Sequence, residues 1–204
     1  MPEQTAAPAP AITPEPIAMP KANEIGSVQT SVQTSSDERI AANAAPPQLV
    51  EPVRKSVRVK APAARAFRVF AEQMDSWWPR THHIGNSPMR RVVVEPRPGG
   101  AIYTEQEDGT GCPWGSVLAW EPPHRFLMAW QINPTWQYEP DLSKCSEVEV
   151  RFTPTDDGHT LVELEHRGLQ RHGEGCDKMR GQIDSEGGWG TILTLFAKKA
   201  EEPA

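Results

Sequence analysis

The chain has 204 residues, of which 37% are hydrophobic, and a formal net charge of −6 at pH 7. Residues 1–52 hold two basic and six acidic residues, so they carry −4 of this charge and the rest is nearly neutral. A nearly neutral surface attracts neither phosphate backbones nor anionic lipids, which excludes nucleic acid and membranes as expected partners. No apolar run approaches the length that a membrane-spanning helix needs.

The first 52 residues differ in composition from the rest of the chain. The first fifty contain eight prolines and ten alanines, and the first aromatic residue is Phe67. A segment without large side chains buries too little apolar surface to offset the entropy of ordering its backbone. We therefore predict a disordered tail over residues 1–52 and one folded domain over residues 53–204.

The predicted domain begins with a strand followed by a helix. Apolar and charged residues alternate over residues 53–60, which is typical of a half-buried strand. Pro62 suits the first turn of a helix, and residues 66–70 place an apolar stripe on it. Residues 74–78 are expected to add a short helical turn.

From residue 91 onward, short apolar runs separated by turn residues predict a meander of antiparallel strands. The predicted strands cover residues 92–95, 101–105, 114–121, 125–132, 146–153 and 160–167. A long polar loop is expected over residues 133–144. Charged residues alternate along the last two strands, and we expect them to pair on a solvated outer face.

A long helix is predicted over residues 177–199, because apolar residues such as Trp189 and Phe196 recur there every three or four positions. Three glycines within residues 187–190 weaken its middle, each by about 1 kcal/mol relative to alanine. Either a kink or a close approach of the helix to the sheet explains them.

This order of elements predicts an α+β fold of the helix-grip kind. A strand, helices, about six strands and a long helix leave no room for parallel crossovers, so a curved antiparallel sheet should wrap around the C-terminal helix. A gap between such a sheet and its helix is where small molecules bind.

The tryptophans are the first candidates for a ligand site. By simple alternation Trp114, Leu118 and Trp120 share one face of a predicted strand, and Trp130 lies on the next strand. Flat indole faces accept aromatic or planar apolar ligands, and packing in an ordinary core is the alternative. The predicted ligand-binding residues are Trp77, Trp78, His82, His83, Trp114, Leu118, Trp120, Trp130, His166 and Trp189.

Three histidines are the candidates for acid–base catalysis, because imidazole titrates near neutral pH. His82 and His83 lie in a loop expected to cover one end of the cavity. His166 alternates in phase with Val162 and Leu164, so it should point inward. A buried histidine with one satisfied hydrogen bond is the alternative for His166. The spacing of the three does not match a zinc site, and we expect no metal.

The cysteines and the remaining motifs point away from several other chemistries. Cys112, Cys145 and Cys176 lie more than thirty residues apart, which suits neither a disulfide framework nor a zinc motif. With no signal sequence, they predict a cytoplasmic protein. The chain contains neither a Gly-x-Ser-x-Gly elbow nor a phosphate-binding loop, so we expect no cofactor and no hydrolysis of ATP.

Several segments carry a combination of motifs that is specific as a set. Trp77-Trp78-Pro79 precedes His82-His83, and Gly187-Gly188-Trp189 lies in the last helix. The other segments cover residues 95–100, 114–123, 148–154 and 164–168. Together they resemble bacterial proteins named after activators of the heat-shock protein 90 ATPase. That family belongs to the START-like superfamily, also called SRPBCC, whose members have the helix-grip fold and an internal cavity.

The resemblance implies three functions that share one fold, so only the chemistry of the site can separate them. The first is a protein that binds a small apolar or aromatic molecule, as a monomer or dimer. The second is an enzyme acting in the same cavity, such as a cyclase, dehydratase or hydrolase. The third is a co-chaperone-like regulator of an ATPase, with a protein partner. Eukaryotic co-chaperone activators carry an additional N-terminal domain, where this chain has its Ala/Pro-rich tail.

Overall fold

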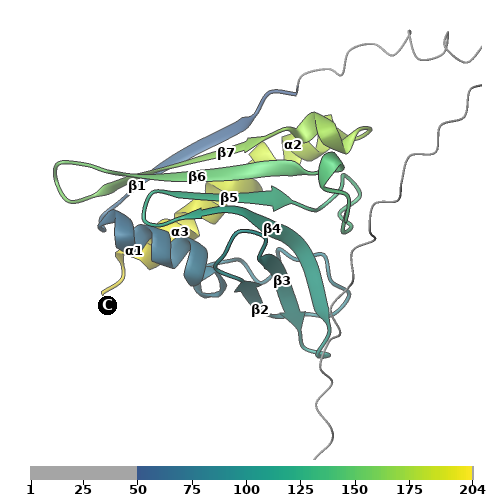
Figure 1. The fold of residues 1–204 in the computed structure, drawn as a ribbon, viewed down its shortest axis with the longest axis horizontal. Helices are drawn as coiled ribbons and strands as arrows, with labels where there is room; N and C mark the ends of the chain where they lie inside the picture. Colours follow the sequence, from purple (N-terminus) through teal and green to yellow (C-terminus); the bar gives the residue numbers. More distant parts are fainter. Residues whose placement is uncertain (1–49, 204) are drawn as a thin grey trace, which may run out of the picture. The chain divides into compact units, whose positions relative to one another are not determined.

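The computed structural model describes residues 50–203 of the chain (Figure 1). The tail predicted over residues 1–52 lies almost entirely outside these described residues. Within the described part, no helix combines the length and the hydropathy needed to cross a membrane.

Seven antiparallel strands form one sheet in the described part of the chain. They are β1 (Val53–Val59), β2 (Met89–Val94), β3 (Ala101–Gln106), β4 (Gly111–Glu121), β5 (Arg125–Trp130), β6 (Ser146–Pro154) and β7 (Thr160–Arg167). Their spatial order is β1-β7-β6-β5-β4-β3-β2. The six later strands therefore form the predicted meander, and β1 extends it by pairing with β7.

The helical segments fall into two groups, one before β2 and one after β7 (Figure 1). The first group is α1 (Ala63–Phe67), the π-helical turn η3 (Arg68–Glu72) and the 3-10 turn η4 (Met74–Ser76). The second group is the 3-10 turn η6 (Leu169–His172), α2 (Cys176–Asp184), the π-helical turn η7 (Glu186–Gly190) and α3 (Thr191–Glu201). One further 3-10 turn, η5 (Leu142–Lys144), lies between β5 and β6.

The hydrophobic core lies between the sheet and these helical segments. Phe70 of η3 contacts Phe196 of α3 with ring centroids 5.1 Å apart, and it also contacts Phe126 of β5 and Phe152 of β6. All four rings are at most 2% exposed. This packing of a curled antiparallel sheet around a C-terminal helical segment confirms the predicted α+β helix-grip fold.

Strand β4 is irregular at two positions. Its pairing with β3 skips Trp114, and its pairing with β5 skips Leu118. An extra residue in one strand shifts the alternation of side chains by one position. Trp114 and Trp120 consequently both pack against the core, whereas Leu118 is 39% exposed. The prediction that Leu118 shares their face is wrong, because simple alternation takes no account of bulges.

The single helix predicted over residues 177–199 is divided in the structure. Gly188 has non-helical backbone angles, φ −88° and ψ −139°, and separates α2 from α3. A β-carbon at Gly188 would lie 2.0 Å from the carbonyl oxygen of Ile183. Only glycine fits this approach of backbone to backbone. The prediction of one continuous helix is therefore wrong. The kink explains why position 188 is a glycine.

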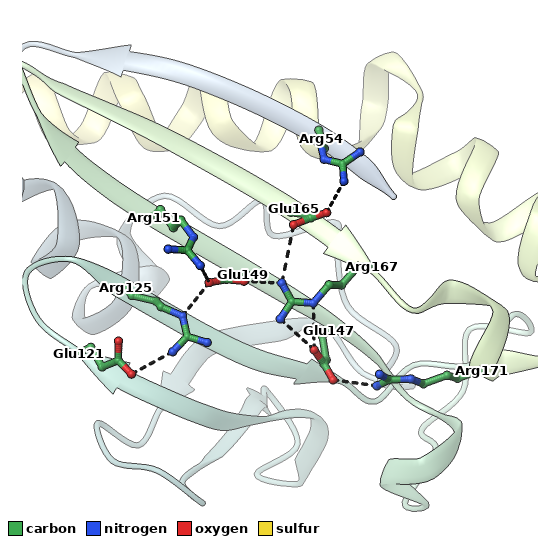
Figure 2. Close-up of polar contacts among 9 residues, drawn as sticks. All are labelled: Arg54, Glu121, Arg125, Glu147, Glu149, Arg151, Glu165, Arg167 and Arg171. Atoms are coloured by element: carbon green, nitrogen blue, oxygen red, sulfur yellow. Dashed lines mark hydrogen bonds and ion pairs between the residues drawn. The ribbon is translucent and has the colours of Figure 1, made fainter. Parts of the chain in front are cut away.

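The outer face of the sheet carries a network of ion pairs across β4 to β7 and β1 (Figure 2). Glu149 lies at its centre, where it is hydrogen-bonded to Arg125 at 2.7 Å and paired with Arg151 and Arg167. Its side chain is only 6% exposed. The predicted pairing of charges is confirmed, but Glu149 is shielded from solvent rather than solvated.

Candidate ligand-binding pocket

A pocket of about 620 Å³ lies between the broken C-terminal helix and the sheet. Its lining comes from the loop that follows η4, from β4 and β5, from the loop after β5, and from α2, η7 and α3. Small organic ligands occupy pockets of roughly 300–1,000 Å³, so this volume is large enough for one. The floor is buried and the rim is exposed.

Four buried tryptophans form most of the floor. Trp78 stacks on Trp114 with ring centroids 5.2 Å apart and an interplanar angle of 23°. Trp130 meets both Trp114 and Trp189 edge-to-face, at 5.8 and 5.9 Å. Each of the four is at most 6% exposed. Stacked and edge-to-face contacts are the favoured arrangements of aromatic pairs, so the four indoles pack as one cluster.

Three of these rings are each positioned by a different local feature. The bulge in β4 turns Trp114 inward, and the kink at Gly188 directs Trp189 toward the sheet. The indole N–H of Trp78 donates to the carbonyl oxygen of His82 at 2.8 Å, which joins the floor to the rim loop. The floor therefore depends on a bulge in a strand, a kink in a helix and a hydrogen bond to a loop.

Three polar atoms of the lining have no hydrogen-bond partner among the described residues. They are Nε1 of Trp114, Nε1 of Trp130 and Nδ1 of His83. A buried donor without an acceptor costs about 1–3 kcal/mol, so native structures keep few of them, and these commonly mark a site for a ligand or water. Two buried indole N–H donors without an acceptor therefore lie in the apolar wall of the pocket.

His82 connects the two sides of the rim. Its Nε2 lies 3.1 Å from the carbonyl oxygen of Gly187 in η7, and its Nδ1 lies 3.2 Å from Oγ of Thr81. Because a carbonyl can only accept, Nε2 carries the proton and Nδ1 accepts from the threonine hydroxyl. Both ring nitrogens of His82 are therefore engaged in holding the loop against the helix.

His166 points inward, as the alternation of β7 predicts, but it lies behind the pocket wall. Its Nδ1 accepts from Nε1 of Trp189 at 3.2 Å, so Nε2 carries the proton and donates to Oγ of Ser146 at 2.7 Å. The Ser146 hydroxyl in turn donates to Nε2 of His172 at 2.8 Å. Burial, and secondarily His172, lower the pKa of His166 to about 3, so its ring is neutral near pH 7.

The sequence matches a family model over most of the described part. The model of the "Activator of Hsp90 ATPase homolog 1-like protein" family matches residues 60–201. The chain belongs to this family. The predicted resemblance is therefore confirmed, together with membership of the START-like (SRPBCC) superfamily. None of the curated proteins compared with the chain matches it.

Three solved structures resemble the chain over nearly their whole length. The anthrahydroquino-gamma-pyrone synthase Txn09 is 39% identical, with 76% of this chain and 99% of that chain covered and a TM-score of 0.53. CalC from Micromonospora echinospora, a self-sacrificing resistance protein, is 30% identical, with 73% and 93% covered and a TM-score of 0.56. Protein NE0264 from Nitrosomonas europaea, at 18% identity and a TM-score of 0.52, shares the fold.

The structure places six of the ten predicted ligand-binding residues of this family member in the pocket lining. They are Trp78, His82, His83, Trp114, Trp130 and Trp189. Trp77 lies outside the lining, with its indole N–H bonded to the carbonyl of Val69 at 2.7 Å. Trp120 packs on Phe67 outside the pocket, with ring centroids 5.3 Å apart. His166 lies behind the wall, and Leu118 points away from the core.

Other lining residues do not belong to the predicted set. Ile84, Ile183 and Ile192 add aliphatic surface, and Trp136 projects from the loop after β5. The isoleucines carry no signal beyond ordinary core hydrophobicity. Trp136 does carry one, since it is an aromatic residue inside an otherwise polar loop.

The described residues offer little to metal or thiol chemistry. No three His, Cys, Asp or Glu side chains within residues 50–203 gather closely enough to hold a metal ion. Cys145 is buried, and burial together with Glu139 and Asp141 raises the pKa of its thiol to about 11. A thiol with so high a pKa is a poor nucleophile at neutral pH.

Proposed function

We propose that the protein binds a planar aromatic small molecule that carries oxygen atoms, in the pocket between the kinked helix and the sheet. One observation carries this proposal. The floor consists of four buried indoles, and the N–H groups of Trp114 and Trp130 have no acceptor among the described residues. Flat rings favour a flat ligand, and N–H donors that have no acceptor favour a ligand with carbonyl or hydroxyl oxygens.

The name of one relative supports this ligand class. An anthrahydroquino-gamma-pyrone, the compound in the name of Txn09, is a fused ring system that bears oxygen atoms. That protein is 39% identical to this chain, which covers 99% of its length. The ligand chemistry inferred from the indole floor therefore agrees with the chemistry named for a relative.

A second candidate function is catalysis on such a molecule, and His83 favours it. His83 lines the pocket, and its Nδ1 has no partner among the described residues. An imidazole with an unpaired nitrogen in the wall of a substrate pocket is a candidate for proton transfer. His82 and His166 are less suited, because both nitrogens of each ring already form hydrogen bonds.

Binding is tested by titrating the full chain with 1,8-dihydroxyanthraquinone while tryptophan fluorescence is recorded. We expect saturable quenching with one ligand per chain. Trp114→Phe and Trp130→Phe keep a ring but remove a donor worth about 0.5–1.5 kcal/mol, so each should weaken binding roughly 2- to 10-fold. Trp120→Phe, outside the pocket, is the matched control. The proposal fails if quenching does not saturate, or if Trp120→Phe weakens binding as much as the pocket variants do.

Catalysis is tested by a mass spectrum of the ligand that remains bound after native purification. The protein is then incubated with that compound, and the compound is examined for chemical change. If the protein is an enzyme, His83→Gln should reduce the rate by about 10²- to 10⁴-fold while affinity stays within about tenfold. A compound that returns unchanged from the wild-type protein leaves binding as the function.

A further inference from the structure

Trp136 has a backbone conformation that does not suit its side chain. It lies in the loop between β5 and η5, and its φ of +60° falls in the left-handed region. Among the described residues, it is the only one other than glycine with a positive φ. The left-handed region is disfavoured for L side chains, and for bulky ones in particular. Glycine would adopt this conformation freely.

The surrounding loop compensates for this conformation. Oδ1 of Asn133 accepts from the backbone N–H and the hydroxyl of Thr135, at 3.0 and 2.8 Å, and from the backbone N–H of Gln137 at 3.0 Å. The backbone N–H of Trp136 also donates to the carbonyl of Asn133 at 2.9 Å. Strained residues persist where their surroundings over-determine them, and they are concentrated at binding sites.

The side chain of Trp136 lines the pocket and is 40% exposed, so it lies at the rim rather than in the floor. The floor indoles are at most 6% exposed. The lining thus includes buried rings in the floor and one exposed ring at the rim. A ligand that lies on the floor must extend to the rim to contact Trp136.

We infer that Trp136 is a specificity-determining residue that stacks on the outer end of an elongated ligand of three or more fused rings. The inference rests on the proposed function and adds to it the length of the ligand and the residue that selects for it. The backbone conformation at position 136 favours glycine. The contact with the ligand explains why the residue is a tryptophan, since the indole provides a flat surface at the open end of the pocket.

The experiment compares two probes, the two-ring 1-naphthol and the three-ring 1,8-dihydroxyanthraquinone, by titration of the full chain. Trp136→Gly should bind the three-ring probe about 5- to 150-fold more weakly, as expected for the loss of one aromatic stacking contact of about 1–3 kcal/mol. It should bind 1-naphthol within about twofold of wild type. Its melting temperature should equal or exceed that of wild type, because glycine relieves the left-handed strain. Trp136→Phe, which restores a flat ring, should recover most of the affinity.

Tyr138→Ala is the matched control, because Tyr138 lies in the same loop and is also 40% exposed but does not line the pocket. It should leave the affinity for both probes unchanged. The inference is overturned if wild type binds both probes and Trp136→Gly weakens both equally or neither. If wild type binds neither probe, the proposed function itself is overturned, and the inference with it.

Discussion

Because of the kink at Gly188, alanine substitutions at Gly188 and Gly190 should change the stability of the domain in opposite directions. A methyl group at Gly188 would lie 2.0 Å from the carbonyl oxygen of Ile183 and 2.9 Å from that of Gln182. Both atoms belong to the backbone, so the helix must shift to admit it, at a cost of about 1–3 kcal/mol. At Gly190 a β-carbon meets no atom within 4 Å, and the backbone is helical. Gly190→Ala should therefore stabilise the domain by about 0.4–1 kcal/mol.

Thermal unfolding followed by far-UV circular dichroism measures both changes. For a domain of about 150 residues, 1 kcal/mol shifts the melting temperature by roughly 2–4 °C. Gly188→Ala should then lower it by about 2–12 °C, and Gly190→Ala should raise it by about 1–4 °C. Gly188→Ala should also weaken binding of the anthraquinone probe, because Trp189 of the pocket floor follows directly.

Gly187→Ala serves as the matched control, since a β-carbon there also meets no atom within 4 Å. The reasoning is refuted if Gly188→Ala is as stable as Gly187→Ala, because a continuous helix would place all three glycines alike. Urea unfolding of the same variants, with an unchanged m-value, would show that stability changed without a change in the compactness of the unfolded chain.

Two further predictions concern pH and the two sides of the sheet. His166 has a pKa near 3 in the folded protein against an ordinary 6.5, so the wild-type protein should lose stability as the pH falls from about 6.5 toward 3. Urea unfolding at several pH values measures this loss. His166→Gln should make the stability depend less on pH over the same range. For Glu149, burial raises the pKa but hydrogen bonds from Arg167 and Arg125 lower it more, so its contribution is present above about pH 4.5 and is lost as the pH falls further. Glu149→Gln should cost about 1.5–3 kcal/mol at pH 7, whereas the exposed control Glu163→Gln should cost less than about 0.5 kcal/mol. Equal losses in the two glutamate variants would contradict a stabilising role for the network.

Most of the fold could be predicted from the sequence, because its elements are regular. Alternation along β6 and β7 identifies both strands and their inward residues, and β7 keeps an unbroken register with β6. His166 therefore points inward as its phase predicts. The Asp-Gly turns and the apolar stripe of the last helix place the remaining elements, since periodicity and turn chemistry are local properties of the chain.

The pocket depended on tertiary structure wherever the chain departs from a regular period. The bulge that exposes Leu118 arises from pairing with β5, and the break at Gly188 brings its backbone so close to the Ile183 carbonyl that only glycine fits. The bond that keeps His166 behind Trp189 joins residues 23 positions apart. Trp136 lines the pocket from a loop in which Asn133 accepts three hydrogen bonds around its left-handed backbone. A periodic pattern shows which face of its own element a residue occupies, whereas these four features depend on neighbours that the chain meets only after folding.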